Sequence, residues 1–425
     1  MKKSRTARPS LGVESPASTR TLPLVDLLVD TKAELFELMV RSGLRVLDAM
    51  LEDDRTALCG PRYAHQPGRT ASRAGTVPSE VVLGGRKVAI QRPRVRAEGR
   101  EVPLPTLQAL TAADPLNQRV VEQMLVGVAT RQYARSLEPV PAGVASRGTS
   151  QSSVSRRFVA KTTAQLQTWQ SAPLDGLDLI ALILDGVHIG EHCLVVALGI
   201  AADGQKHALG LWEGATENAT VCQGLLANLQ SRGLRTDRSL LVILDGAKAL
   251  HKAVRAVFGA AALIQRCQVH KLRNILEYLP ERQRAWVQAI VRRAYHHTDV
   301  KAATRLLTDL ARRLDTDYPS AAASVREGLD ETLTILTLQL SPRLQRSLAT
   351  TNPAESLLSR TRHVTRHVKR WRGGSMMVRW VAAGILEAVK GFRRLKGHGD
   401  LPRLVAALRA RDQQLGLTTA VTHVA

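Results

Sequence analysis

Two similar apolar segments of this 425-residue chain decide its fold: residues 179–186 read LIALILDG and residues 240–246 read LLVILDG. Each is a short run of Leu, Ile and Val that ends in Asp-Gly, which is typical of a buried β-strand followed by a turn. Ligand sites of open α/β folds lie at the carboxyl ends of their strands. One Asp-Gly is an ordinary turn dipeptide, but two on neighbouring strands favour a shared metal site formed by Asp185 and Asp245, each ending its strand.

The residues around these segments alternate between strand and helix patterns. Strands are predicted at residues 193–200, 207–212 and 263–267, and helices at residues 220–232 and 247–258. Asp203-Gly204 is a hairpin turn signal between the first two of these strands. The resulting order of strand, hairpin, helix, strand, helix, strand predicts an α/β fold with a mixed sheet of the ribonuclease H (RNase H)-like kind.

The composition limits the class of protein. Lys and Arg number 60 and Asp and Glu 37, a formal charge of +23 at pH 7, which is typical of proteins that bind nucleic acid or an acidic membrane surface. No apolar run approaches the ~18 residues that span a bilayer, and no signal-peptide core follows the basic start. Four scattered cysteines indicate a reducing compartment. We therefore expect a cytoplasmic protein that binds nucleic acid and no membrane.

The charge is unevenly distributed along the chain. Residues 171–245 contain nine acidic and four basic residues, whereas residues 341–400 contain 13 basic and three acidic ones. A concentration of carboxylates in a basic protein suggests a bound cation, and Mg²⁺ is held by a few carboxylates together with waters and substrate phosphates. Two such ions ~3.5–4 Å apart can activate a nucleophile and stabilise the leaving oxygen of a phosphodiester.

A third metal ligand is predicted at Glu355, in the sequence TNPAE of residues 351–355. Asn352 is a good N-cap and Pro353 a good first helical residue, which makes Glu355 the third residue of a helix. The same pattern resembles a capping box, in which the glutamate would bond only backbone. Few other acidic residues follow in this basic region, which favours the metal-binding interpretation.

A block of purely helical patterns separates these acidic residues. Residues 273–348 place Leu306, Leu307, Leu310 and Leu314 on one helical face, and an all-helical block inside an α/β pattern predicts an inserted domain. The predicted organisation is a disordered basic arm (1–20), an N-terminal DNA-binding or dimerisation region (21–110), a helix-turn-helix-like DNA-binding region (111–170), the first part of the catalytic core (171–272), the helical insertion (273–348), the last part of the core with its basic helices (349–400) and a polar C-terminal tail (401–425).

The region before residue 110 combines helical spacing with a basic hairpin. Residues 22–51 predict one helix, or two that break at Gly43. Residues 80–83 and 87–91 predict a hairpin around Gly84-Gly85. Its cations suit phosphate contact, although a merely solvated basic loop is the alternative. The predicted DNA-contacting residues here are Arg86, Lys87 and Arg94.

Residues 118–157 have the pattern of a helix-turn-helix. A second short helix is predicted to open at residues 130–134, and a recognition helix follows at residues 150–157, where Ser, Gln and Arg suit contacts to bases and phosphates. Helix-loop-helix segments are also common in proteins that do not bind DNA. The predicted contacts here are Arg131, Ser152, Ser153, Arg156 and Arg157.

A run of cations follows Glu355. Next to a candidate phosphodiester site, phosphate contact is favoured over the alternative of a solvated helix face. The predicted DNA contacts in this run are Arg360, Arg362, Arg366, Lys369, Arg370 and Arg372. Trp371 and Trp380 fit either a core or base stacking.

Cys267 and His270 form a Cys-x-x-His pair at the end of the predicted strand 263–267. Such a pair is half of a structural zinc site, which needs four ligands. The other cysteines are isolated and supply no second pair. A buried polar brace near the active site is the favoured interpretation.

These motifs together resemble the Mutator-type insertion-sequence transposases of bacteria, a branch of the Asp-Asp-Glu (DDE) recombinases. The matching sequences are DG at 185–186, the stretch 199–212 with its Asp-Gly turn, DG at 245–246, QRCQVHKLRN at 265–274 and TNPAES at 351–356. The spacings of 60 and 110 residues between the three acidic residues agree as well. The resemblance covers residues 115–400 and is weak before them. One departure is TVCQ at 220–223, where the family often has a bulky aromatic residue.

The resemblance implies that Asp185, Asp245 and Glu355 are catalytic and bind two Mg²⁺ ions, for which Mn²⁺ can substitute. It also implies that Cys267 and His270 are the family's (Cys/Asp)-x-x-His element, and we expect Asn352 to support the same site. The implied fold is an RNase H-like core interrupted by helices, preceded here by the helical DNA-binding region. The implied location is the bacterial cytoplasm, at the nucleoid.

The predicted function is therefore that of a DNA transposase. It recognises terminal inverted repeats, cleaves double-stranded DNA at element ends and joins the 3′-hydroxyls to target DNA, as a homodimer or larger assembly. Two alternatives stay open. One is a catalytically silent, domesticated DNA-binding protein, and the other is an RNase H-like nuclease without strand transfer.

Overall fold

The computed structural model describes residues 21–417 except 65–67, 69, 84, 113–114, 138–139, 142, 190–191, 215–218 and 369. The predicted arm at 1–20, the predicted contact Lys369 and the last eight residues of the predicted tail lie outside these described residues. The chain divides into two compact units. The first comprises Met1–Val120 and Thr130–Ser155, and the second Val121–Ala129 and Arg156–Ala425.

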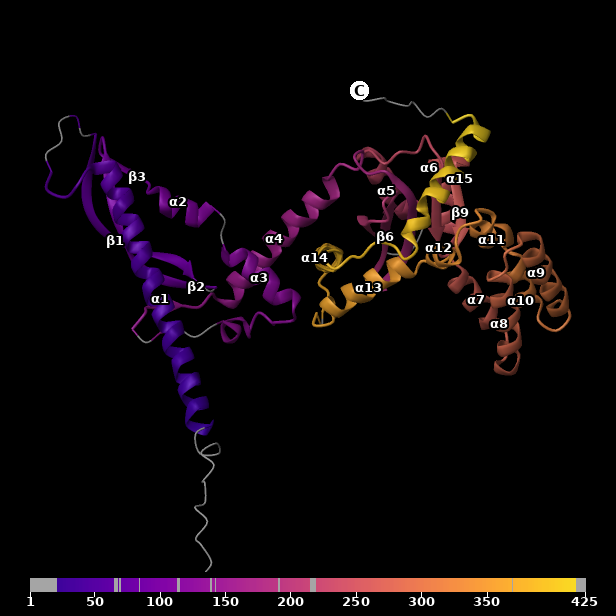
Figure 1. Ribbon diagram of the computed structural model, residues 1–425, viewed down its shortest axis with the longest axis horizontal. Helices are drawn as coiled ribbons and strands as arrows, with labels where there is room; N and C mark the ends of the chain where they lie inside the picture. Colours follow the sequence, from indigo (N-terminus) through magenta and orange to yellow (C-terminus); the bar gives the residue numbers. More distant parts are fainter. Residues whose placement is uncertain are drawn as a thin grey trace, which may run out of the picture. The chain divides into compact units, whose positions relative to one another are not determined.

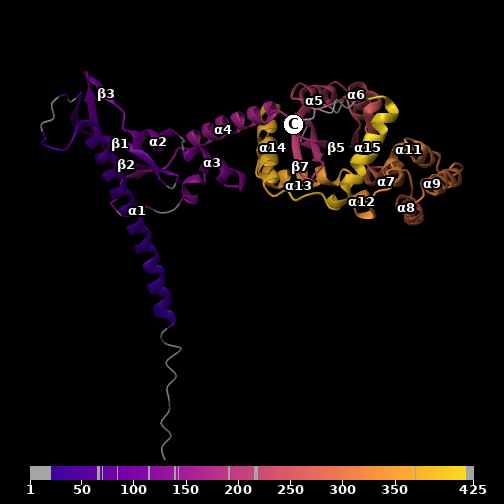
Figure 2. The same cartoon turned by 45° about the horizontal axis from the view of Figure 1, so that its top comes forward.

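The first unit is a small sheet packed on a long helix. Its elements are α1 (Thr21–Cys59), β1 (Ala71–Leu83), β2 (Arg86–Ala97), β3 (Arg100–Val102), α2 (Pro105–Ala112) and β4 (Ser146–Arg147). The predicted hairpin is confirmed, with β1 and β2 antiparallel and longer than expected. The hairpin lies along α1 (Figure 2), where Leu51 of the helix packs against Val88 and Val95 of β2. Gly43 does not break α1, because the helix continues through it.

The helix-turn-helix pattern is only partly present. Its outer helices exist as α3 (Pro115–Leu125) and α4 (Gln151–Ser171), and α4 is much longer than a recognition helix requires. The second short helix, predicted to open at residues 130–134, is the 3₁₀ helix η1 (Tyr133–Ser136) rather than an α-helix, and it begins at Tyr133. Gly127 has a left-handed φ of 103° and Leu137 is extended. These two positions bound the segment, and among its described residues only the short 3₁₀ turn Tyr133–Ser136 forms.

The second unit is built on a five-stranded sheet in the order β7-β6-β5-β8-β9. Its strands β6 and β9 are labelled in Figure 1. Its strands are β5 (Leu179–Ile189), β6 (His192–Ala201), β7 (Lys206–Gly214), β8 (Leu240–Leu244) and β9 (Ala262–Arg266). The first three pair as an antiparallel meander, and β8 and β9 are parallel to β5. Gly204 turns the β6–β7 hairpin with a left-handed φ of 84°, as its Asp-Gly signal predicted. The fold is therefore mixed α/β.

Both faces of this sheet are buried, which explains the continuous apolar runs of its strands. Leu182, Leu184 and Leu244 point to the face covered by α5 (Ala219–Ser231) and α6 (Lys248–Phe258). Ile183 and Ile243, one residue earlier in their strands, point to the opposite face, whose core includes residues of α13 (Asn352–Thr365) and α14 (Gly374–Val389). The two helix layers lie on either side of the sheet in Figure 1.

Helices fill the chain between β9 and α13. They are α7 (Gln268–Glu277), α8 (Glu281–Tyr295), α9 (Val300–Leu314), α10 (Pro319–Arg326), α11 (Leu329–Thr337) and α12 (Pro342–Leu348). The predicted Leu stripe is buried at Leu307, Leu310 and Leu314. Beyond α14 and the 3₁₀ helix η3 (His398–Asp400), residues 401–415, predicted as part of a polar tail, form α15 (Leu401–Leu415). Its buried Leu404 and Leu408 account for this difference.

None of the helices in the described part of the chain combines the length and the apolar character that crossing a membrane requires.

Side chains rather than a further strand cover the outer edge of β9. The Thr334 hydroxyl of α11 donates to the Ile264 carbonyl at 2.7 Å. The fully buried Gln265 donates from Nε2 to the Thr332 carbonyl at 2.9 Å and accepts from the Ile335 N–H at 2.7 Å. Helix α11 is thereby attached to the sheet, and its Thr334 pairs with the Ile264 carbonyl, which an open strand edge would leave unpaired.

Replacing Gln265 by leucine should loosen α11. Gln265→Leu leaves the Ile335 N–H and the Arg266 carbonyl without the amide partner that they have now. Loss of a buried hydrogen-bond partner costs ~1–3 kcal/mol, so amides of residues 329–337 should exchange with deuterium about 10- to 100-fold faster. The control is Gln288→Leu in α8, and unchanged exchange in Gln265→Leu would contradict this role.

Candidate active site

The pairing of three parallel strands fixes the position of the predicted aspartates. Leu184 of β5 lies opposite Leu244 of β8, which lies opposite Arg266 of β9. The next residues along these strands are therefore also neighbours: Asp185, Asp245 and Cys267. Adjacent strands lie ~4.8 Å apart, so the two aspartates share one end of the sheet. Because side chains alternate between faces, Asp185 shares the face of Ile183, on which α13 packs.

The expectation that Asp185 ends its strand is wrong. Strand β5 continues to Ile189 because residues 186–189 pair with β6, and only the parallel pairing with β8 ends at Leu184. Asp185 is 4% exposed. Asp245 does follow the end of its strand, and its Oδ1 accepts from the Ala247 N–H at 2.9 Å. Asp245 thus stabilises the turn that an Asp-Gly pair suggests, and it also lies next to Asp185 and Cys267 across the strands.

Glu355 lies in the first turn of α13, one residue off the predicted capping pattern. The N-cap position is Thr351 rather than Asn352, and no side chain caps this terminus. Glu355 Oε1 instead accepts from the Thr351 hydroxyl at 3.2 Å and lies 3.5 Å from His270 Nε2. The capping-box alternative is therefore not what the carboxylate does. The neighbouring Ala354 is buried in the same core as Ile183.

Cys267, His270 and Thr351 form a polar brace that joins β9, α7 and α13, with Cys267 and Thr351 buried and His270 half-buried. The Thr351 hydroxyl lies 3.5 Å from Cys267 Sγ and 3.4 Å from His270 Nδ1, and the Thr351 N–H lies 3.4 Å from the same sulfur. The hydrogen bond with Cys267 raises the pKa of His270 to about 9, and the charges of Asp185 and Glu355 add to the rise. Although burial raises the pKa of the Cys267 thiol, hydrogen bonds with His270 and Thr351 lower it on balance.

The donor set of this region fits a hard cation. Carboxylate oxygens are the ligands that Mg²⁺ prefers. Asp185 of β5 and Glu355 of α13 both add through their charges to the rise in the pKa of His270, so both carboxylates lie near this side chain. Within the described residues, no three His, Cys, Asp or Glu side chains already form a ready cluster for a metal ion. The carboxylates are thus suitable in kind and neighbouring in position, without being preassembled.

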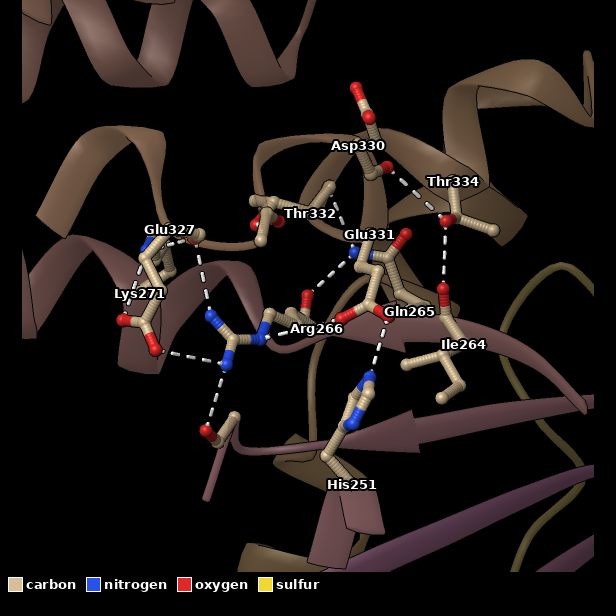
Figure 3. Close-up of polar contacts among 12 residues, drawn as sticks. His251, Ile264, Gln265, Arg266, Lys271, Glu327, Asp330, Glu331, Thr332 and Thr334 are labelled. Atoms are coloured by element: carbon tan, nitrogen blue, oxygen red, sulfur yellow. Dashed lines mark hydrogen bonds and ion pairs between the residues drawn. The ribbon is translucent and has the colours of Figure 1, made fainter. Parts of the chain in front are cut away.

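Sequence reasoning missed the residue that supports the Asp245 turn. Arg266 is 7% exposed and donates to the Gly246 carbonyl at 3.0 Å. It also donates to the Glu327 carbonyl at 3.2 Å (Figure 3). Its Nε lies 3.6 Å from Glu331 Oε2, and the other oxygen of Glu331 lies 2.7 Å from His251 Nε2. Arg266 therefore ties the turn after Asp245 to the start of α11. The available signal was a cation at the end of a strand that begins with three apolar residues.

The cations predicted to contact DNA fall into two groups. In the β1–β2 hairpin, Lys87 pairs with Glu80 at 3.2 Å and Arg94 with Glu101 at 3.1 Å, while Arg86 donates to the Leu137 carbonyl at 3.4 Å. These pairs reduce the charge that the hairpin offers to phosphate. The exposed predicted residues are Arg131, Ser152, Arg156, Arg360, Arg362, Arg366, Arg370 and Arg372, with Ser153 and Arg157 half-buried. Trp380 belongs to the core, where its ring lies 4.4 Å from that of Phe158.

Comparison with known proteins gives a consistent result. The family model described as "Transposase, Mutator family" matches residues 24–394. The transposase for insertion sequence element IS6120 of Mycolicibacterium smegmatis is 29% identical over 292 residues, which cover 67% of this chain and 87% of that protein. The transposase for insertion sequence element ISRM3 of Rhizobium meliloti is 26% identical over 382 residues, covering 87% of this chain and 88% of that protein.

The packing of Arg266 can be tested through Gly328, the residue before α11. Gly328 has φ 60° and ψ 35°, and an added Cβ would lie 2.7 Å from Arg266 Cδ. Gly416 has nearly the same backbone, φ 65° and ψ 23°, with nothing within 4 Å of an added Cβ. Both alanine variants carry the ~1–2 kcal/mol cost of a left-handed residue. Gly328→Ala adds ~1–3 kcal/mol of overpacking and should lower the melting temperature by about 2–8 °C more. Equal melting temperatures would show that Arg266 is not held rigidly.

Proposed function

The chain belongs to the Mutator family of transposases, and we propose that it moves an insertion sequence by cutting DNA at the element's ends and joining the freed 3′-hydroxyls to target DNA. One observation carries the proposal. The register of β5, β8 and β9 makes Asp185 and Asp245 neighbours, and α13 packs on the same face of the sheet with Glu355 in its first turn. Carboxylates that lie near one another beside the carboxyl end of β8 suit metal-dependent phosphodiester chemistry.

Asp185, Asp245 and Glu355 would hold the metal ions. Two bound Mg²⁺ ions, or Mn²⁺ in their place, would supply Lewis-acid activation of the attacking oxygen and charge stabilisation at the leaving 3′-oxygen. The attacking oxygen belongs to water in the cleavage step and to a DNA 3′-hydroxyl in the joining step. Neither step requires a covalent bond between protein and DNA.

The remaining residues of the site position these carboxylates. The Thr351 hydroxyl orients Glu355 by donating to Oε1. His270 holds a positive charge 3.5 Å from the same oxygen, which reduces the repulsion between the carboxylates of the metal-free protein. Arg266 fixes the Gly246 carbonyl, and with it the turn that presents Asp245. Each of these residues acts on the reaction through a metal ligand.

The proposed fold is RNase H-like. An antiparallel meander followed by two parallel strands supports it, as do helices on both faces of the sheet. In this interpretation, helices α7 to α12 are an insertion between β9 and the helix that carries Glu355.

The proposed partner is double-stranded DNA, both as the element's terminal inverted repeats and as the target. Residues 21–170 would recognise the repeats, with α4 offering exposed Ser152 and Arg156 at its first turns. Two ends must be brought together for one transposition event, so we propose a homodimer or a larger assembly on DNA.

Removing any one carboxylate should abolish chemistry without abolishing DNA binding. Asp185→Asn, Asp245→Asn and Glu355→Gln should each lower cleavage and joining of a labelled inverted-repeat duplex in Mg²⁺ by ~10²–10³ or more, because each removes a charge that acts in the transition state. The matched controls are Asp317→Asn and Glu281→Gln, which change exposed carboxylates of the helical segment.

The same assay separates the alternatives. Cleavage without joining would indicate a nuclease, and full binding without either reaction in the wild type would indicate a silent DNA-binding protein. Wild-type rates in any of the three carboxylate variants would overturn the assignment of that residue.

Metal binding can be measured without any reaction. A ligand that binds only the folded protein raises its melting temperature, with ~2.7 kcal/mol gained at 100 times its dissociation constant. Mg²⁺, Mn²⁺ and Ca²⁺ should each stabilise the wild type after treatment with a chelator, and Asp185→Asn should lose most of this shift. Equal shifts in wild type, Asp185→Asn and Asp317→Asn would place the bound ions elsewhere.

A further inference from the structure

A basic groove of about 960 Å³ opens beside the helix that carries Glu355. Helix α12 contributes Arg343 and Arg346 to it, and α13 contributes Arg360. The segment between α14 and η3 contributes Arg393, Arg394 and Lys396. Lys206, the first residue of β7, lies in the groove as well, and no acidic side chain is among its lining residues. We call this feature the 343–396 groove.

The cations of the 343–396 groove differ from Lys87 and Arg94 of the hairpin in having no acidic partner within the described part of the chain. None of the seven forms an ion pair with a carboxylate of the described residues, whereas Lys87 and Arg94 do. Burial and the neighbouring charge of Arg360 together lower the pKa of Lys206. Like charges gathered without a counter-charge repel one another. No carboxylate of the described residues lines the groove to offset that repulsion, so a bound polyanion would relieve it.

The walls of the groove are held in place by contacts of their own. The Ser347 hydroxyl of α12 donates to the Lys396 carbonyl at 2.9 Å, and the Leu395 N–H donates to the Gly204 carbonyl of the β6–β7 turn at 2.8 Å. The ammonium of Lys206 lies 4.9 Å from the centre of the Phe392 ring. The segment 391–396 is thus tied both to α12 and to the sheet, so the groove exists before anything binds.

The groove begins at the proposed catalytic helix. Asn352, Pro353 and Ser356 line it, while Glu355, next to Ser356 in the chain, contacts Thr351 and His270. Successive residues of a helix point ~100° apart around its axis, and a helix with its side chains is ~10–12 Å wide. A strand lying in the groove therefore passes within about one helix diameter of Glu355.

We propose that the 343–396 groove binds the sugar-phosphate backbone of the DNA strand that continues from the phosphate to be cleaved. Its exposed guanidinium groups suit the bidentate binding of phosphate oxygens. Contacts of this kind fix the register of a duplex without reading its bases. The placement relative to the cleaved phosphate rests on the proposed function, whereas the binding of DNA phosphates in the groove does not.

The salt dependence of DNA binding tests the groove. The full-length variant Arg343→Ala/Arg393→Ala/Arg394→Ala and the wild type are titrated into a fluorescent inverted-repeat duplex between 50 and 300 mM KCl. Each lost phosphate contact lowers the slope of log Kd against log salt by ~0.9, so the variant should lose about two to three in slope and bind about 10- to 1,000-fold more weakly at low salt. The control, Arg282→Ala/Arg293→Ala/Arg305→Ala, removes three exposed cations from α8 and α9 and should keep the wild-type slope. Equal slopes in both triple variants would overturn the proposal.

Neutral linkages in the DNA identify the phosphates concerned. Methylphosphonates at successive positions on either side of the cleaved phosphate should weaken binding to the wild type at the positions that the groove holds. The groove variant should not respond to the same substitutions. If wild type and variant lose affinity by equal factors at every position, the groove does not contact the backbone and the proposal is wrong.

Two further arms separate other outcomes. Tripolyphosphate should compete with DNA only at concentrations far above that of the duplex phosphates. If tripolyphosphate binds tightly and the groove variant keeps its DNA affinity, the groove binds a small polyphosphate and the proposal is overturned. If the groove-dependent slope appears but wild type neither cuts nor joins DNA in Mg²⁺, the proposed function fails while the groove stands. If wild type cuts and joins DNA but the groove variant keeps the wild-type slope, the proposal for the groove fails while the proposed function stands.

Discussion

The register of three parallel strands is the constraint on which the rest of the site depends. Leu184, Leu244 and Arg266 occupy one row of the sheet, so the next row holds Asp185, Asp245 and Cys267. A slip of one residue in either pairing would send a side chain to the opposite face. Both faces are packed with apolar side chains, which makes such a slip costly. The position of the carboxylates is therefore set by the core.

Charge is arranged in layers around this row. The charges of Asp185 and Glu355 add to the rise in the pKa of His270, and Arg266 bridges the Asp245 turn and Glu331. Farther out, the cations of the 343–396 groove have no carboxylate partner among the described residues, in contrast to the paired cations of the β1–β2 hairpin. The net charge of +23 thus does not show which cations are paired with carboxylates and which are unpaired. The unpaired cations are the ones that attract a polyanion.

The sequence was sufficient where a pattern was local. The repeated apolar run before Asp-Gly placed Asp185 and Asp245 on adjacent strands, because buried parallel strands read as continuous apolar segments. It could not show that β5 continues past Asp185, since pairing with β6 decides that. Thr351 and Asn352 are both good caps, so the sequence could not choose between them. Arg266 acquires its role from Glu327 and Glu331, about 60 residues away, which no local pattern contains.

The cover that α11 places on β9 also limits how copies of this protein can associate. An open strand edge is a template on which another chain can add a strand. Here the Ile264 carbonyl is already bonded to Thr334, and Gln265 to the backbone of α11. Two copies cannot merge their five-stranded sheets into one continuous sheet through β9 while α11 stays bound. The assembly on DNA that we propose would therefore have to be held by helices, loops or the nucleic acid itself at this end of the sheet.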